Sequence, residues 1–281
     1  MAVEVTIKSK SLFKKKLSFN DILLDDMRFG IMDEAFRLDE GKTGDYTVVF
    51  SSKNICRGYE VSLDKGCINL RMPLPTSRYD IEYFYEYVKI LCEKRGVKKF
   101  KRDEEEISFD LIEKCIDLDI TTCNSALKKM SEGISSGEYS IQYTFGAVCP
   151  IALGKKEFDF INGDCEKFGE LLNKLQSMDV YYAKGSIYQK KNEDYFGVFV
   201  LTAGVDSVFP LKPKILMSDN KLKVDEWYVG FVIDGEMKGF IPYDKLIESI
   251  KTDNTFDSEH FIITMDGKKM EKLLSKHKVD L

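Results

Sequence analysis

The sequence predicts an α+β protein with antiparallel or mixed sheets and helices packed on them, divided into two subdomains. Short segments of alternating polarity, separated by hairpin turns, recur along the chain and predict sheets. Amphipathic segments with helix caps follow several of them. Two glycines and two serines gather at residues 133–137, which predicts a boundary between residues 1–133 and residues 138–281.

The first half of the chain opens with a predicted strand, because apolar and polar residues alternate over residues 3–9. Ser18 then begins a short helical segment with Asp21 at the capping-box position. Residues 45–51 are rich in β-branched and aromatic side chains, as strands are. Residues 57–63 and 67–72 flank a turn that ends in glycine, which predicts a hairpin.

Residues 77–96 form the best-defined helix of the chain. Ser77 is placed to cap its first turn, and Gly96 is suited to the position after its last. One apolar stripe follows at helical spacing: Ile81, Phe84, Tyr85, Val88, Leu91 and Cys92. We interpret this segment as a core helix that covers a sheet. The alternative is a helix that binds a partner through Tyr79, Tyr83 and Tyr87.

The remaining elements follow the same rules. Residues 97–101 predict a strand before a charged turn, and residues 109–130 predict either one helix or two short ones. Asp234-Gly235 is the strongest hairpin signal. The further predicted elements are strands at 139–145, 180–189, 195–201, 226–233, 238–241 and 260–265, helices at 164–178, 244–250 and 268–276, and a loop at 212–222.

Composition limits the classes of partner. The 281 residues are 43% hydrophobic, and their 42 basic and 47 acidic side chains give a net charge of −5, so no overall field attracts nucleic acid or anionic lipid. Residues 98–102 (KKFKR) are the nearest approach to a nucleic-acid motif, but acidic residues follow at once. The longest nearly apolar runs fall far short of the ~20 residues that a membrane-spanning helix needs. We expect neither nucleic acid nor membrane as a partner.

The seven cysteines form no CxxC pair, and the opening residues lack the apolar core of a signal peptide. We therefore expect a reduced, cytoplasmic protein whose cysteines act as small hydrophobic residues. With two histidines and no phosphate-binding glycine motif, the sequence predicts no metal and no cofactor. His260 is the single candidate for a catalytic triad, and no GxSxG motif accompanies it, so catalytic residues stay unknown and the balance leans away from an enzyme.

Residues 27–44 mix aromatic side chains with charges of both signs. We interpret them as a loop held by a surface ion-pair network, with a polar pocket as the alternative. Guanidinium groups bind carboxylates and phosphates in bidentate geometry. The candidate ligand-binding residues are Arg28, Asp33, Arg37, Arg57 and Arg71.

Several short sequences resemble a bacterial family of unknown function, the domain-of-unknown-function family 4299, whose members have a similar length. They are Arg28-Phe29-Gly30, Asp33-Glu34, Arg37-Leu38-Asp39-Glu40-Gly41, Arg57-Gly58 and Pro73-Leu74-Pro75-Thr76. The resemblance is strongest over residues 1–100. It implies a cytosolic bacterial protein and no particular activity, so it transfers no functional residue.

Two hypotheses for function follow. The first is a cytoplasmic binding or regulatory module that acts through protein partners, which rests on the absence of catalytic motifs and on the tyrosines of residues 77–96, since tyrosine is favoured at interfaces. The second is an enzyme or small-ligand binder with an arginine and carboxylate pocket for an anionic or polar ligand.

Overall fold

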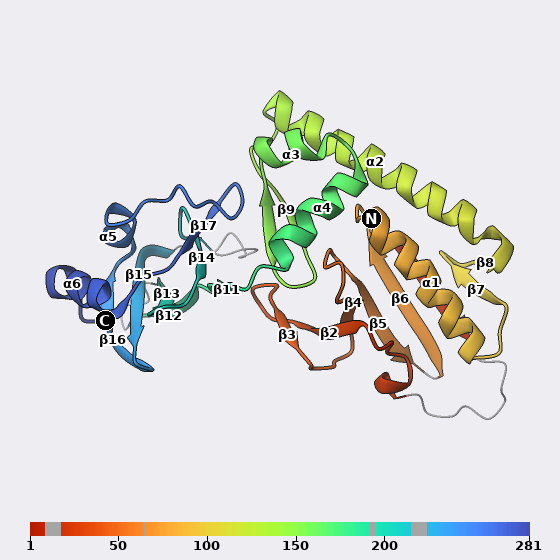
Figure 1. Cartoon of the computed structure of the whole chain (residues 1–281), viewed down its shortest axis with the longest axis horizontal. Coiled ribbons are helices and arrows are strands. Elements are labelled where there is room, and N and C mark those ends of the chain that lie inside the picture. The colour runs from red at the N-terminus through yellow and green to blue at the C-terminus, as the bar shows by residue number, and fades with distance from the viewer. Residues whose placement is uncertain (9–17, 65, 191–194, 215–223) are drawn as a thin grey trace. The chain divides into compact units, whose positions relative to one another are not determined.

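The computed structural model describes residues 1–8, 18–64, 66–190, 195–214 and 224–281. The chain forms two compact units, Met1–Ser177 and Met178–Leu281, and each is described by itself (Figure 1). The division between these units falls after the glycine- and serine-rich stretch. That stretch is the last turn of a helix, and Gly137 caps it at φ 76°. Residues 215–222 of the expected loop lie outside the described residues.

The first unit is built on one antiparallel sheet of eight strands in the order β3-β2-β4-β5-β6-β1-β7-β8. The alternation predicted from the sequence is confirmed in β1, where Val3, Val5 and Ile7 are buried. The strands are β1 Ala2–Lys8, β2 Met27–Met32, β3 Leu38–Glu40, β4 Thr47–Ser51, β5 Tyr59–Asp64, β6 Cys67–Pro73, β7 Lys99–Arg102 and β8 Glu105–Ser108.

Helix α1 (Arg78–Lys94) covers one face of this sheet, as its apolar stripe predicts. The Ser77 hydroxyl accepts a hydrogen bond from the Asp80 amide at 2.9 Å, which confirms the predicted cap. Tyr83 and Tyr87 are 9% and 0% exposed, and their hydroxyls donate to Asp26 and to the Ile22 carbonyl. The alternative of a tyrosine face that binds a partner is therefore wrong, because the protein's own core buries two of its three members.

The predicted helical region after β8 is one helix, α2 (Ile112–Ser136), which packs against α1. Helix α4 (Cys165–Gln176) also packs against α1, and at Gly169 the two come so close that an added Cβ would lie 2.6 Å from the Ser77 Cβ. Between α2 and α4 lie β9 (Gln142–Phe145), β10 (Pro150–Leu153) and α3 (Lys155–Ile161).

The second unit contains two sheets, both of which include a parallel pair of strands. Its core joins them through aromatic side chains such as Phe199, Phe209 and Phe231. The four-stranded sheet has the order β12-β13-β15-β16, and the three-stranded sheet has the order β11-β14-β17. The elements are β11 Tyr181–Tyr182, β12 Ser186–Gln189, β13 Tyr195–Thr202, β14 Ser207–Pro210, β15 Val224–Ile233, β16 Glu236–Pro242, α5 Tyr243–Glu248, β17 His260–Ile263 and α6 Gly267–His277.

The α+β class is thus confirmed, with three differences in detail. Residues 27–44 contain the paired strands β2 and β3 and not only a loop, although the expected ion pairs are present. The charged segment after β7 forms strand β8. The strand predicted at 180–189 divides into β11 and β12, which belong to different sheets.

All seven cysteines are free thiols, and six of them are buried, which agrees with a role as small hydrophobic residues. Within the described parts of the chain, no helix has the length and hydropathy needed to cross a membrane.

Candidate functional site

The arginines singled out from the sequence have separate partners. Arg28 on β2 makes a bidentate pair with Glu40 on β3, with both N–O distances at 2.7 Å. That hydrogen bond lowers the pKa of Glu40 and holds the pair charged at neutral pH. Across β6 and β5, Arg71 uses a single nitrogen, Nη1, to donate to both carboxylate oxygens of Glu60 at the surface, at 3.1 and 3.2 Å.

Asp33 and Arg37 are brought together in the turn between β2 and β3. Asp33 Oδ2 accepts hydrogen bonds from Arg37 Nε at 3.0 Å and Nη2 at 2.8 Å. Its Oδ1 accepts from the backbone amides of Ala35 and Arg37. This carboxylate closes the turn from within, which allows Phe36 to adopt a positive φ of 56°.

Arg57 is partly exposed, and it donates to two backbone carbonyls. Its Nε donates to the Phe145 carbonyl at 3.0 Å and its Nη1 to the Pro75 carbonyl at 2.7 Å. Burial lowers the pKa of Arg57 to about 10, opposed by the charge of Asp80. The structure therefore pairs Asp33 with Arg37 and gives Arg28, Arg57 and Arg71 other partners. Among these five, Arg71 lines a surface cavity.

His260 has both ring nitrogens engaged. Its Nδ1 lies 2.7 Å from Asp257 Oδ1, and its Nε2 lies 2.9 Å from the Tyr182 hydroxyl. The same Asp257 oxygen accepts from the backbone amides of Glu259 and His260, so the group fixes the turn that leads into β17. Over the described residues, no three His, Cys, Asp or Glu side chains gather closely enough to hold a metal ion.

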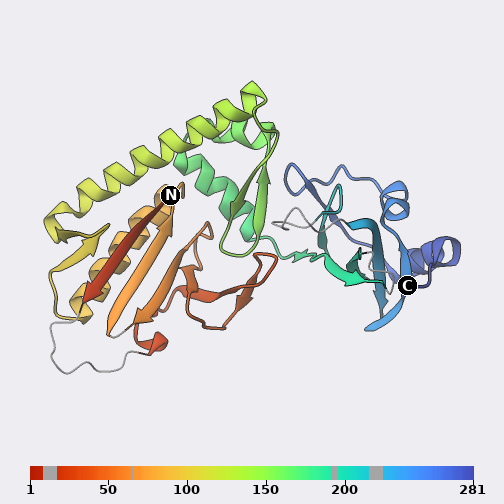
Figure 2. The same cartoon turned by 180° about the vertical axis from the view of Figure 1, so that it is seen from behind.

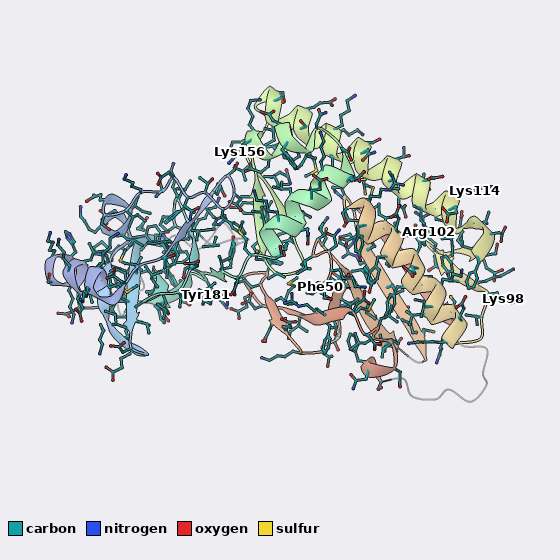
Figure 3. All side chains as sticks on the ribbon, in the orientation of Figure 1. Phe50, Lys98, Arg102, Lys114, Lys156 and Tyr181 are labelled. Atoms are coloured by element: carbon teal, nitrogen blue, oxygen red, sulfur yellow. The ribbon has the colours of Figure 1, made fainter. Side chains whose placement is uncertain are left out.

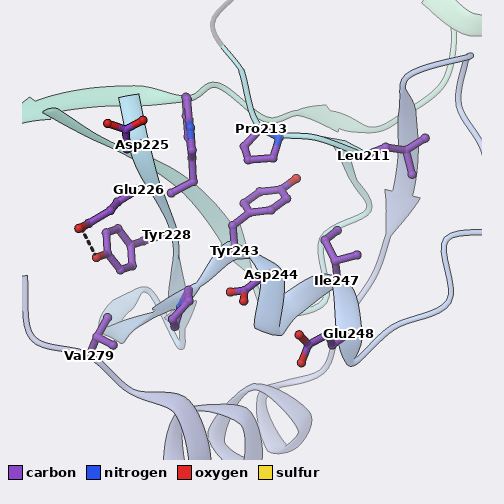
Figure 4. A pocket seen from close by; sticks show the side chains of 12 residues that line it. Leu211, Pro213, Asp225, Glu226, Tyr228, Tyr243, Asp244, Ile247, Glu248 and Val279 are labelled. Carbon is purple, nitrogen blue, oxygen red and sulfur yellow. Dashed lines mark hydrogen bonds between the residues drawn. The ribbon is translucent and has the colours of Figure 1, made fainter. Parts of the chain in front are cut away.

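A different site is the groove on the second unit, a cavity of about 600 Å³ formed by β15, α5 and the chain after β14 (Figure 4). Its volume is in the range of small-ligand and peptide sites. We call it the aromatic groove. Its lining is apolar at Leu211, Pro213, Trp227, Tyr228, Pro242, Tyr243, Ile247 and Val279, and acidic at Asp225, Glu226, Asp244 and Glu248.

The floor of the aromatic groove is packed against the core of the second unit. Tyr243 is 3% exposed, its hydroxyl donates to the Pro210 carbonyl at 2.5 Å, and its ring lies 5.5 Å from that of Phe199. Trp227 packs on the same Phe199 ring at 5.4 Å between centroids. Figure 4 shows Pro213 beside the Tyr243 ring. The aromatic rings are therefore held by the core and present fixed surfaces to the groove.

Glu226 stands at the polar edge of the aromatic groove. Its Oε2 accepts a hydrogen bond from the Tyr228 hydroxyl at 2.6 Å, drawn in Figure 4, and from Lys190 at 2.5 Å. These bonds lower the pKa of Glu226, while the bond to Glu226 raises the pKa of Tyr228 to about 12. At neutral pH this edge thus presents a charged carboxylate beside a neutral phenol.

Two described lysines pair with carboxylates of the aromatic groove. Lys190 pairs with Glu226, and Lys245 pairs with Glu248 at 2.8 Å. Both pairs are at the surface, where an ion pair contributes only ~0–1 kcal/mol. An incoming cation can take the place of either lysine at small cost.

The sequence reasoning missed the aromatic groove. Its signals were the single tryptophan within Asp225-Glu226-Trp227-Tyr228 and the segment Pro242-Tyr243-Asp244. Each segment joins aromatic and acidic residues. Only the pairing of Tyr228 with Pro242 across β15 and β16 brings the two segments together.

The two units and this groove define an α+β protein with a surface groove on its smaller unit. The chain belongs to the family described as domain of unknown function (DUF4299), whose model matches residues 2–273. This match confirms the resemblance noted in the sequence. Comparison with curated proteins and with solved structures gives no match.

Proposed function

We propose that the protein is a binding module whose second unit takes an extended, lysine- or arginine-containing segment of a protein partner in the aromatic groove. The supporting observation is the combination of rigid aromatic and proline surfaces with four carboxylates in one cavity. The bacterial and cytoplasmic setting inferred from the sequence belongs to this proposal.

The aromatic lining supports a cationic and extended ligand. The faces of tryptophan and tyrosine attract ammonium and guanidinium groups, by ~0.5–1 kcal/mol at exposed sites and more when water is excluded. Grooves lined with aromatic side chains also receive extended polyproline-type segments, whose conformation is already restricted before binding. Trp227 and Tyr228 offer such faces, and Pro213 and Pro242 complete the apolar walls.

The acidic lining of the aromatic groove supports a positively charged ligand. Among the described residues, the lining of the aromatic groove contains four carboxylates and neither lysine nor arginine. A basic side chain that lies over an aromatic face meets a carboxylate beside it, as Lys190 already meets Glu226. An acidic segment would face uncompensated repulsion in the same place.

Trp227 also provides the assay, because it is the only tryptophan in the chain. The experiment titrates the full chain with an acetylated, amidated peptide of alternating proline and lysine, and with its proline and glutamate counterpart. We expect the basic peptide to shift the tryptophan emission with saturation and the acidic peptide to have no effect. Isothermal calorimetry then measures the affinity independently of fluorescence.

Variants test whether the peptide binds in the aromatic groove. Tyr228→Ala removes one aromatic face and is expected to weaken binding at least tenfold. Tyr243→Phe keeps the ring in the groove and serves as a test of fold integrity. Tyr188→Ala is the matched control, since Tyr188 is 51% exposed on β12 and does not line the groove. Equal binding of the two peptides, or equal loss in Tyr188→Ala, would overturn the proposal.

A further inference from the structure

The eight-stranded sheet of the first unit has a second face, opposite helix α1, that is hollowed by cavities. Helix α1 covers one face, and the view from behind shows β5, β6 and β1 in front of that helix (Figure 2). Two cavities of about 540 and 380 Å³ lie on this open face and share Thr6 in their lining. We call this surface the open sheet face.

The strand register aligns polar side chains across the open sheet face. Thr6 on β1 lies opposite Asn69 on β6 and opposite Lys101 on β7, and Asn69 in turn lies opposite Ser62 on β5. The Thr6 hydroxyl donates to Asn69 Oδ1 at 3.1 Å. The amide nitrogen of Asn69 and the hydroxyl of Ser62 have no hydrogen-bond partner among the described residues, so both are available to a ligand.

An aromatic ring stands at one end of this row. Tyr46 directly precedes β4, is 68% exposed and lines the larger cavity together with Ser62 and Asn69. An exposed aromatic ring beside hydrogen-bonding groups is suited to stack on a planar ring, and such stacking is worth ~1–3 kcal/mol for a nucleobase. This end therefore favours a planar heterocycle.

Lysines stand at the other end of the row. Lys8, Lys98, Lys99 and Lys101 line the smaller cavity, against one carboxylate, Glu106. Lys99 pairs with Glu106 at 2.6 Å, and Lys101 pairs with Glu104 at 3.0 Å, both at the surface where such pairs are weak. Lys8 and Lys98 have no carboxylate partner within the described residues, and Figure 3 shows Lys98 at the periphery of the unit. An anion would relieve the repulsion between these neighbouring cations.

The row of side chains is about as long as a nucleotide. Neighbouring strands are ~4.8 Å apart, so the four strand intervals from Tyr46 to Lys101 span about 19 Å. A nucleoside triphosphate in extended form has a comparable length. It also carries the three chemical parts that the row presents in order: a planar ring, hydroxyl groups and a polyanion.

We propose that the open sheet face binds a nucleoside polyphosphate, with its base on Tyr46, its ribose at Ser62 and Asn69, and its phosphates at Lys8, Lys99 and Lys101. This site lies in the first unit and is independent of the aromatic groove. The proposed site differs from the arginine and carboxylate pocket expected from the sequence. Of the five residues expected there, only Arg71 lines the larger cavity, together with Glu4 and Glu60.

The test is isothermal calorimetry on the full chain with ATP, GTP, CTP and UTP, with tripolyphosphate and with adenosine, all in EDTA. We expect at least one nucleotide to bind at least tenfold more tightly than tripolyphosphate, and adenosine to bind weakly. The paired variant Lys8→Gln with Lys101→Gln is expected to weaken that nucleotide at least tenfold and to flatten its dependence on salt. Tyr46→Ala is expected to weaken the nucleotide without changing the affinity for tripolyphosphate.

The control is Lys89→Gln, which removes an exposed lysine from α1 on the covered side of the sheet. Failure of all four nucleotides to bind would overturn the proposal. It would also be overturned if tripolyphosphate bound as tightly as every nucleotide, if Lys89→Gln had the same effect as the paired variant, or if a single-stranded oligonucleotide bound where mononucleotides did not.

Discussion

The Arg57 guanidinium donates a 3.0 Å hydrogen bond to the Phe145 carbonyl, 88 residues away in the sequence. Its second bond reaches the Pro75 carbonyl just before α1. One partly buried side chain thus connects the start of β5, the end of β9 and the turn that leads into the central helix. We expect this connection to contribute strongly to stability, because both bonds have a charged donor.

Arg57→Lys tests that connection. Lysine has a single ammonium group in place of the planar guanidinium and cannot donate to both carbonyls in the same geometry. We therefore expect the free energy of unfolding to fall by roughly 2–3 kcal/mol. Urea denaturation monitored by circular dichroism measures the change. Arg71→Lys, at an exposed pair with Glu60, is the control and should cost less than about 1 kcal/mol. Equal effects of both substitutions would contradict the role given to Arg57.

Arg102 on β7, labelled in Figure 3, joins Tyr85 on α1 and Asp119 on α2 in a second network, in which the tyrosine and the aspartate are buried. Arg102 donates to the Tyr85 hydroxyl at 2.8 Å and to Asp119 Oδ1 at 2.6 Å, and Tyr85 donates to Asp119 Oδ2 at 2.7 Å. Arg102→Met alone leaves a buried carboxylate without its cation, so we expect a loss of roughly 3–5 kcal/mol. Asp119→Leu added to it should recover much of that loss. A double-mutant cycle in urea decides the point, and simple additivity would refute the coupling.

Gly197 on β13 leaves the space that the Trp227 ring occupies. The two residues lie opposite each other in the parallel pair β13 and β15, and an added Cβ at Gly197 would overlap the ring. We expect Gly197→Ala to displace the indole, shift its emission maximum and weaken the basic peptide at least tenfold, although it replaces no lining residue. If the emission and the affinity both stayed as in the wild type, Trp227 would not be a fixed part of the groove.

The affinity of the aromatic groove for a basic peptide should depend on pH through its carboxylates. The pKa of Glu226 is lowered by the hydrogen bonds from Lys190 and Tyr228, so this group keeps its charge below the ordinary glutamate value of about 4.3. Because the pKa of Glu226 is lowered, its carboxylate loses its charge, and with it the attraction for the peptide, only at acidic pH. We expect a constant affinity from pH 8 to about 5 and a decline only below that. A decline between pH 7 and 6 would indicate a histidine, and the groove lining has none.

The thiols should differ sharply in reactivity. Burial raises the pKa of Cys92 and Cys123 to about 12, so neither forms the reactive thiolate at neutral pH. Cys67 on β6 is the one cysteine that is not buried. With Ellman's reagent at pH 8, we expect one fast equivalent from the folded protein and six more after unfolding in urea. Cys67→Ser should remove the fast phase, and its persistence would place the reactive thiol elsewhere.

Local signals made part of the fold predictable. Helix α1 was found because Ser77, the apolar stripe and Gly96 all lie within one segment and agree with one another. Strand β8 was missed because the turn before it uses Asp103 and Glu104 at positive φ, where glycine or asparagine would have marked a hairpin. The arginine cluster was expected from residue type alone, and residue type does not show that a fold supplies each arginine with its own acceptor.

The aromatic groove and the open sheet face were missed for a different reason. Trp227 and Tyr243 converge because β15 and β16 pair and α5 follows at once. The row from Tyr46 to Lys101 exists only in the register of five strands. Such sites depend on pairing between distant segments, which hydrophobic periodicity does not specify.

Strand β1 has its own consequence for how the first unit assembles during synthesis. It lies inside the sheet, with Val5 opposite Leu70 on one side and Arg102 on the other. The ribosome therefore releases this strand long before either neighbour exists. Its backbone amides have no strand partner, and its apolar side chains stay exposed, until β6 and β7 have been synthesised. The same strand that completes the sheet is thus the one most exposed to pairing with a neighbouring nascent chain.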